Sequence, residues 1–325
     1  MGPGPTTITS VRRTGLALAV AAALTGLTAL SACTTAGSDA TSPSQGASAS
    51  PSRSAGADGG AGRQDGGTDP ASVAALKSAE RATGAADSAR VESTTTMGSL
   101  MSMKATGVLS WSDGLTGTLT LTYTGGSVAD AMRRLGSTSM EARYLPDAYY
   151  ARMGDAFAAQ AGGRHWLRYA YQDLERLADG AGAQLGDQMR NTAPHHSVKL
   201  LLACGDARRV GEERVRGDRA THYRGTVDVA ALAPRDSGLD AAELADLKDR
   251  LTRAGVTTQT VDVWVDGRGL LVKKAEKAVT SSGELTQTAY YSGYGVDVTT
   301  QAPPAADTKD FKDLVGDQGG PGGVS

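Results

Sequence analysis

The chain has 325 residues, with 33 Lys and Arg against 35 Asp and Glu, and a formal net charge of −2. This near-neutral balance argues against nucleic acid as a partner. The sequence also has no basic stripe interleaved with aromatic residues, which a nucleic-acid-binding surface would need. Aromatic residues make up only 5% of the chain. An apolar core must therefore be built mainly from Leu, Val, Ala and Met.

The N-terminal segment has the three parts of a bacterial export signal. Two arginines at residues 12–13 supply the positive charge, and an uncharged run rich in Leu and Ala follows over residues 15–30. This run of about sixteen residues is on the short side of the ~17–25 that a membrane-spanning helix needs. It ends in Leu-Ser-Ala-Cys at residues 30–33, the pattern of a lipoprotein processing site. We therefore predict a lipoprotein signal peptide over residues 1–32.

Cys33 is the predicted lipid anchor. Cleavage before it leaves 293 residues and, because two arginines are removed, shifts the net charge from −2 to −4. Two or three acyl chains, at ~0.8 kcal/mol per buried methylene, give lasting membrane attachment where one would not. The predicted location is the extracytoplasmic face of the cell membrane, reached by the Sec or the twin-arginine route. An ordinary signal peptide or an uncleaved signal-anchor with a chance cysteine is the alternative.

Residues 33–68 are predicted to form a flexible tether. From residue 34 onwards this segment contains no Leu, Ile, Val, Met or aromatic side chain. It cannot bury enough apolar surface to offset the entropy of ordering. A Gly/Ser-type coil of this length spans about 30–35 Å, so the folded domain would stay close to the bilayer. We expect that domain over residues 69–312 and a disordered Gly-rich tail over residues 313–325.

The folded part is predicted to begin with a helix from Asp69 to about residue 86, because Asp is a good N-cap and the following Pro fits the first turn. Helical spacing also predicts helices over residues 172–178, 194–204 and 239–254. Period-two patterns predict strands over residues 103–111, 115–124, 139–145, 148–153, 165–169, 208–215, 220–229, 257–265, 270–280 and 285–292. About ten strands and four helices indicate an α+β fold, in which an extensively antiparallel sheet carries helices on one face.

The clearest strand signal surrounds a Ser-Asp-Gly turn at residues 112–114. A two-residue loop would place the apolar residues of one strand on the polar face of the other. A three-residue loop pairs Leu109 with Gly117 and Gly107 with Leu119, which puts both apolar sets on one face. We therefore predict a hairpin with one apolar face and one face lined by threonines.

No motif for catalysis or metal binding stands out, so neither an enzyme activity nor a cofactor is expected. The Gly-x-Ser-x-Gly, Ser-x-x-Lys and His-Glu-x-x-His signatures are absent. His195 and His196 point to different sides of a helix and have no third ligand nearby, so they are interpreted as solvent-facing. His222 is interpreted as a sheet-surface histidine. A hydrolase would need His222 or His195 to lie beside a serine and a carboxylate.

Two further features receive structural interpretations. Cys204 follows an apolar run and has no disulfide partner if Cys33 is acylated, so it is expected to be a small buried hydrophobe. The Arg-Gly-Asp tripeptide at residues 216–218 lies between two predicted strands and is expected to be a hairpin turn. Glu212 and Glu213 are expected on a solvated strand edge.

Apolar surface is the remaining candidate for function. A curved sheet with one apolar face can be packed fully by helices, or it can leave a cavity for acyl chains, and the sequence alone leaves both possibilities open. The side chains predicted to line such a cavity are Leu109, Trp111, Leu119, Leu121, Tyr123, Leu244, Leu247 and Leu251.

Three short motifs resemble actinobacterial LppX/LprG-type lipoproteins. They are YSGYGVDV at residues 291–298 with Ala-Pro-Pro at 302–304, VDVWVD at 261–266 with Gly-Leu at 269–270 and Lys273, and THYRGTVD at 221–228. Their order, behind a lipoprotein signal and a tether, matches that family across about residues 70–310. The resemblance implies a LolA-like fold, in which a highly curved antiparallel sheet, or half-barrel, has helices covering its concave face.

The function that this resemblance implies is reversible binding of an acylated lipid or glycolipid and its transfer within the cell envelope. The membrane, through acylated Cys33, and the lipid are the expected partners, and the protein is expected to be a monomer. The alternative is an envelope sensor or interaction module that binds another membrane protein. That alternative predicts a filled core together with an exposed apolar patch.

Overall fold

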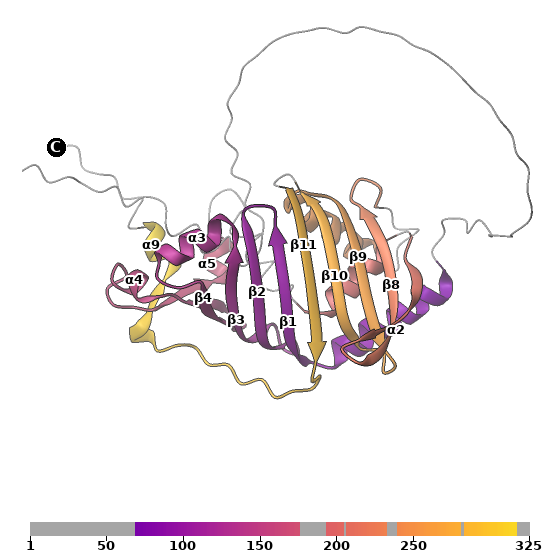
Figure 1. Ribbon diagram of the computed structural model, residues 1–325, viewed down its shortest axis with the longest axis horizontal. Helices are drawn as coiled ribbons and strands as arrows, with labels where there is room; N and C mark the ends of the chain where they lie inside the picture. Colours follow the sequence, from indigo (N-terminus) through magenta and orange to yellow (C-terminus); the bar gives the residue numbers. More distant parts are fainter. Residues whose placement is uncertain (1–68, 176–192, 205, 233–238, 281–282, 317–325) are drawn as a thin grey trace, which may run out of the picture.

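The computed structural model describes residues 69–175, 193–204, 206–232, 239–280 and 283–316 (Figure 1). The predicted signal peptide, the anchor Cys33 and the tether over residues 33–68 lie outside the described residues. The last helix, α9 (Phe311–Gly316), extends past the boundary predicted at residue 312. Residues 317–325 of the predicted tail lie outside the described residues.

One sheet of twelve strands organises the described part of the chain, in the order β12-β6-β5-β4-β3-β2-β1-β11-β10-β9-β8-β7. All neighbouring strands are antiparallel except β12 and β6. The strands are β1 Ser88–Met97, β2 Met101–Ser110, β3 Thr116–Gly125, β4 Ser139–Tyr144, β5 Ala148–Arg152, β6 Trp166–Ala170, β7 Arg208–Val215, β8 Asp218–Asp228, β9 Val256–Asp266, β10 Leu271–Thr280, β11 Gly283–Ser292 and β12 Thr308–Asp310. The predicted α+β class with an extensively antiparallel sheet is confirmed.

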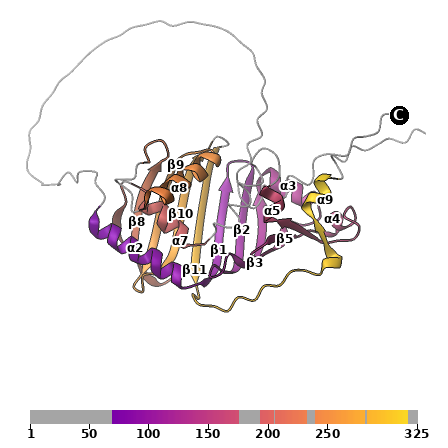
Figure 2. The same cartoon turned by 180° about the vertical axis from the view of Figure 1, so that it is seen from behind.

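Helices α2, α7 and α8 lie against one face of this sheet, over β8 to β10 (Figure 2). We call this the inner face and the opposite one the outer face. Helix α3 packs on β2 and β3, whereas α5 and α9 pack on β6. The helices are α2 Pro70–Ala85, α3 Gly126–Arg134, α4 Asp155–Ala158, α5 Tyr171–Glu175, α7 His195–Leu202, α8 Ala241–Arg253 and α9, with a 3-10 turn, η3, at Ala305–Asp307.

Local sequence explains where the two longest helices begin. The Asp69 carboxylate accepts hydrogen bonds from the backbone N–H groups of Ala71 and Ser72, and Pro70 occupies the first helical position of α2, as predicted. Helix α8 begins with a capping box between Asp240 and Glu243. Each cap satisfies backbone donors that would otherwise lack a partner at the helix start.

Helix α7 is the most deeply placed of the helices on the inner face. Val198 and Leu201 are fully buried, and the end of the helix approaches β8 at Gly225. A Cβ atom at Gly225 would lie 2.7 Å from the Cβ atom of Cys204, which is closer than real side chains pack. A glycine is therefore needed for α7 to pack this closely on β8.

A strap after β11 connects the middle of the sheet to its β12 edge. Residues 293–307 run along one end of the central strands and bring β12 alongside β6 (Figure 1). Ser88 Oγ donates a hydrogen bond to the carbonyl oxygen of Val296 at 2.6 Å, and Arg143 Nη1 donates to that of Gln301 at 3.0 Å. These two hydrogen bonds fix the strap to the beginning of β1 and to β4.

The β2–β3 hairpin has the predicted register. Leu109 lies opposite Gly117 and Gly107 opposite Leu119, so the apolar residues of both strands share the inner face. Gly107 and Gly117 have φ values of 158° and 148°, which side chains rarely adopt. A Cβ atom at either position would lie 2.1–2.2 Å from a backbone carbonyl oxygen of the partner strand. At these two positions, β2 and β3 thus lie closer together than a residue with a Cβ atom would allow.

We expect Gly107→Ala and Gly117→Ala each to lower the free energy of unfolding by about 1–3 kcal/mol or more, because each substitution adds backbone strain to a steric clash. Gly211→Ala, also in a strand, is the matched control, since a Cβ atom there has nothing within 4 Å. Urea unfolding of the three variants measures the difference. Equal stability of all three would contradict this account of the close pairing.

Candidate functional site

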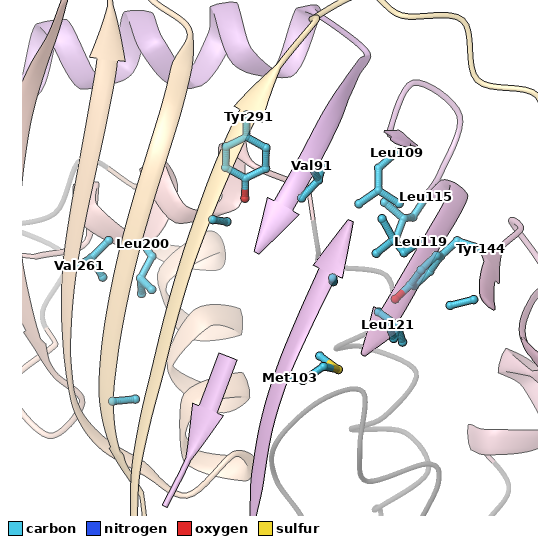
Figure 3. Close-up of a cluster of buried hydrophobic side chains, with 14 of the residues drawn as sticks. Val91, Met103, Leu109, Leu115, Leu119, Leu121, Tyr144, Leu200, Val261 and Tyr291 are labelled. Carbon is cyan, nitrogen blue, oxygen red and sulfur yellow. The ribbon is translucent and has the colours of Figure 1, made fainter. Parts of the chain in front are cut away.

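The inner face of the central strands forms one continuous apolar surface. Val91, Leu109, Leu119, Leu121 and Tyr291 stand on the same side of the sheet (Figure 3). They belong to a single buried hydrophobic cluster that extends from β6 to β8 and includes residues of α2, α3, α7 and α8. This apolar region, which crosses the sheet from β6 to β8, is the main candidate for a functional site.

The structure places the eight predicted lining residues in two groups. Leu109, Leu119, Leu121 and Tyr123 are buried on the inner face of β2 and β3, and Trp111 packs at the edge of the same cluster. The second group is Leu244, Leu247 and Leu251, which are buried on the sheet-facing side of α8, the helix that packs on β9. All eight side chains contribute to one cluster, and their role as lining remains a prediction.

Trp111 has a distinct place at the end of the hairpin. Its indole Nε1–H donates to the carbonyl oxygen of Gly84, in the last turn of α2, at 2.9 Å. Its ring meets that of Tyr294 edge to face, with 6.3 Å between the centroids. Trp111 therefore fastens the hairpin to α2 and to the C-terminal strap.

Methionines are concentrated in one half of the interior, and none of them is among the eight predicted lining residues. Every methionine among the described residues is at most 5% exposed, and all of them lie on β1, β2, α3 and β4 or just after β5. They are Met97, Met101, Met103, Met132, Met140 and Met153. Unbranched thioether side chains adapt to neighbours of irregular shape. This half of the interior can therefore repack more easily than a core of branched side chains.

A row of tyrosines continues the inner face beyond β3. Tyr144, Tyr149 and Tyr169 lie opposite one another on β4, β5 and β6. Their rings are 5.1 Å and 5.8 Å apart, and Tyr169 stacks on Phe311 of α9 at 4.8 Å. Burial raises the pKa of all three phenols, so they are neutral hydrogen-bond donors at any physiological pH.

A buried ion pair crosses the other half of the inner face. Lys274 Nζ contacts Glu276 Oε1 at 3.1 Å on β10 and donates to Ser197 Oγ of α7 at 3.0 Å. Gln259 of β9 donates to the second oxygen of Glu276 at 3.2 Å. The two charged side chains are 12% and 16% exposed. Because each charge has a partner, this network can link α7 to the sheet inside apolar surroundings.

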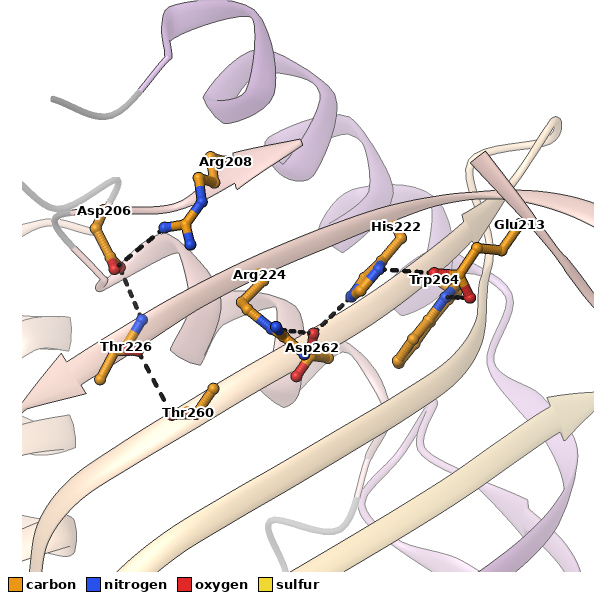
Figure 4. A network of polar contacts seen from close by, with 9 residues as sticks. All are labelled: Asp206, Arg208, Glu213, His222, Arg224, Thr226, Thr260, Asp262 and Trp264. Atoms are coloured by element: carbon orange, nitrogen blue, oxygen red, sulfur yellow. Dashed lines mark hydrogen bonds and ion pairs between the residues drawn. The ribbon is translucent and has the colours of Figure 1, made fainter. Parts of the chain in front are cut away.

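The expectation that His222 is a sheet-surface histidine is wrong, because the side chain is buried. It lies on the outer face between two carboxylates, with Nε2 at 2.5 Å from Asp262 Oδ1 and Nδ1 at 3.0 Å from Glu213 Oε1 (Figure 4). Its ring stacks on Trp264 with 4.2 Å between centroids. Glu213 also accepts a hydrogen bond from the Trp264 indole. The edge strand β7 thus places the Glu213 carboxylate over the imidazole ring. Both ring nitrogens contact carboxylates. In a hydrolase, one of them would instead contact a serine hydroxyl.

The other titratable candidates are structural. Cys204 is buried, as predicted, and burial raises the pKa of its thiol, which opposes a nucleophilic role. His195 and His196 are half-buried, which corrects the solvent-facing interpretation, and burial together with Lys199 lowers the pKa of His195. Within the described residues, no three His, Cys, Asp or Glu side chains cluster as metal ligands.

The Arg-Gly-Asp tripeptide forms the turn between β7 and β8, as predicted, with Arg216 and Gly217 at positive φ. Glu212 is exposed on β7 at the edge of the sheet, also as predicted. No helix in the described part of the chain has the length and apolar character to cross a membrane.

Comparison with known proteins places the chain among bacterial lipoproteins. No protein-family model matches the sequence. A Streptomyces coelicolor protein named "Putative lipoprotein SCO4650" is 58% identical over 248 residues, which is 76% of this chain and 78% of the relative. The chain belongs to the SCO4650 family of lipoproteins. An "uncharacterized 31.2 kDa protein" of Streptomyces griseus is 54% identical over 78% of this chain and 84% of its own length.

Among solved structures, this SCO4650-family chain is similar to lipoprotein LppX of Mycobacterium tuberculosis, with a TM-score of 0.46 and 16% identity over 72% of this chain and 100% of LppX. The LppX/LprG-type lipoproteins, which the three sequence motifs resemble, are thus found among the similar proteins. As a lipoprotein, the SCO4650-family chain is a lipid-anchored protein of the cell envelope.

The Lys274–Glu276 pair provides a test of how α7 is held. Lys274→Met should lower the free energy of unfolding by about 3 kcal/mol, because Glu276 would stay buried without its cation. The double variant Lys274→Met/Glu276→Leu should recover most of this loss, since no charge is then left unpaired. A double-mutant cycle by urea unfolding measures the coupling. Additive effects of the two substitutions would show that the pair does not act as a unit.

Proposed function

We propose that this lipoprotein is a non-enzymatic carrier that binds an acylated lipid or glycolipid between the sheet and its helices and transfers it within the cell envelope. Cys33 is its acylated anchor, and the extracytoplasmic face of the cell membrane is its location. The predicted domain organisation, with a tether over residues 33–68 before the carrier domain, belongs to this proposal. The proposal also includes that the protein is a monomer and that nucleic acid is not a partner.

The observation that carries the proposal is the methionine-rich, continuously apolar inner face. Protein cores that need a single packing arrangement are built mainly from Leu, Ile, Val and Phe, whose rotamers are well defined. Here every described methionine is buried in the half formed by β1 to β5 and α3. Flexible thioethers can repack around a guest of variable shape, which a branched side chain resists. This composition favours a binding interior over a rigid core.

The energetics of transfer suit a passive carrier. Burying a sixteen-carbon chain is worth roughly 12 kcal/mol at ~0.8 kcal/mol per methylene, about what the bilayer itself provides. Movement between membrane and protein would therefore run near equilibrium and need no nucleotide. In this proposal, Leu109, Leu119 and Leu121 on β2 and β3 contact such a chain on the methionine-rich side.

Two adjacent residues on β2 allow a matched test of lipid binding. Ala105 lies on the inner face opposite Leu121, and its neighbour Thr106 is exposed on the outer face. Ala105→Phe should fill space needed by the acyl chain and weaken binding at least tenfold, at a cost of about 1–3 kcal/mol in stability from overpacking. Thr106→Phe should leave binding unchanged.

The measurement is transfer of a fluorescent diacyl lipid between vesicles by the full-length protein, with circular dichroism to confirm that both variants are folded. Mass spectrometry of lipids extracted from the protein purified from a Streptomyces host identifies the natural ligand. Absence of both transfer and co-purified lipid would overturn the carrier proposal. Equal binding by both variants would remove the inner face of β2 from the site.

The anchor has a separate test in the two cysteines. Cys33→Ala should abolish incorporation of an alkyne-labelled fatty acid and release the protein from the membrane fraction, because no thiol is left to acylate. Cys204→Ala should keep the label, since the Cys204 side chain is buried. Gel fluorescence after metabolic labelling reports both results. A label that persists in Cys33→Ala would place the anchor elsewhere.

A further inference from the structure

The tyrosine row contains two hydroxyl groups that make no hydrogen bond with the described residues. Tyr149 and Tyr169 are 0% and 1% exposed, and the hydroxyl oxygen of each lacks a partner. By contrast, the buried Tyr123 hydroxyl donates to Met140 Sδ at 3.9 Å, and Tyr294 donates to the carbonyl oxygen of Leu271. Most buried polar groups in proteins are paired, so two neighbouring exceptions on adjacent strands require a physical reason.

Packing alone does not account for the hydroxyls. The rings of Tyr149 and Tyr169 contact aromatic neighbours, namely Tyr144 and Phe311. Phenylalanine would make the same ring contacts and would avoid the cost of burying an unpaired hydroxyl. The chain nevertheless places tyrosine at both positions. A hydrogen-bond acceptor that arrives with a ligand would supply the missing partner.

The acceptor must be uncharged. Burial raises the pKa of both phenols, and the further influences on Tyr149 are other phenols, Tyr144 first and then Tyr123, Tyr169 and Tyr171. Both hydroxyls are therefore protonated donors. Within the described residues no cation contributes to the pKa of either group, so the described surroundings offer no charge to balance a buried phosphate.

We propose that Tyr149 and Tyr169 form a binding site for the carbonyl oxygens of an ester-linked or amide-linked acyl chain. This inference rests on the proposed carrier function and names the part of the lipid that the interior recognises. The carbonyl end would accept hydrogen bonds from the two phenols, and the hydrocarbon would extend along the inner face of β3 and β4. Met140, on β4 opposite Leu121, lies between these two regions and can repack to admit the chain.

Ester and ether lipids separate this site from general apolar binding. A diacyl glycerolipid has carbonyl oxygens, and its dialkyl ether counterpart has chains of equal length without them. The full-length protein should bind the diacyl lipid roughly 3- to 10-fold more tightly for each hydrogen bond formed. Tyr149→Phe and Tyr169→Phe should each reduce this ester preference, and the double variant should bind both lipids equally.

The thermal midpoint of the lipid-free protein is a second measurement. The site variants and the control variant are expected to change it in different ways. Tyr149→Phe and Tyr169→Phe should leave the thermal midpoint unchanged or raise it, because each substitution removes an unpaired buried group. Tyr294→Phe is the control, since it removes a hydroxyl that has a backbone partner. It should lower the midpoint and leave the ester preference of lipid binding intact.

The possible failures are distinguishable. Equal binding of diacyl and dialkyl lipids by the unaltered protein would overturn the tyrosine site and leave the carrier function standing. Absence of binding to either lipid would overturn the carrier function itself. A fall in the thermal midpoint of Tyr149→Phe and Tyr169→Phe as large as that of Tyr294→Phe would show that the hydroxyls have a structural partner, such as bound water, and would also overturn the site.

Discussion

The pairing of β1 with β11 is the constraint on which the rest of the structure depends. These strands come from opposite ends of the folded chain, with Val91 opposite Tyr291 and Met97 opposite Leu285. Their ladder joins strands β1 to β6, with β12, to strands β7 to β11, and so makes two groups of strands into one sheet. Because side chains alternate between the two faces along a strand, this register also puts Val91 and Tyr291 on the inner face, in one cluster with the apolar residues of β2 and β3. A continuous apolar interior is the direct consequence.

The two faces of the sheet are held by different interactions. On the outer face, charged side chains pair across strands, as where Arg216 reaches Glu92 from the β7–β8 turn and His222 is enclosed by carboxylates. Water can compete for the more exposed of these contacts, so they add little energy individually. On the inner face, polar groups are few and each is costly if unpaired. This asymmetry explains why Lys274 and Glu276 are closely paired there.

Local signals in the sequence were sufficient for elements that bury one face. The threonine alternation of β3 predicted both a strand and its register, and the spacing of Leu244 and Leu251 predicted α8. Strand β1 was missed because its inner positions include Ser93 and Thr95, so its hydrophobicity does not alternate; its two neighbours in the sheet determine it. The three residues of β12 are too short for any periodic pattern. The burial of His222 follows from how β7 folds over it, which no local signal reports.

The candidate site likewise has one part that could be predicted from local sequence and one part that could not. Apolar lining residues can be proposed from alternation within single strands, but the tyrosine row exists only through the registers of β4 with β5 and of β5 with β6. The interior therefore has two chemically different ends: an ion pair with satisfied partners beneath α7, and, beyond β3, two protonated phenols that lack a partner among the described residues. A paired network holds a helix in place and has no capacity left for a ligand, whereas an unpaired donor gains most when a ligand arrives. Recognition is therefore expected at the tyrosine end of the interior, with the ion pair keeping the opposite end rigid.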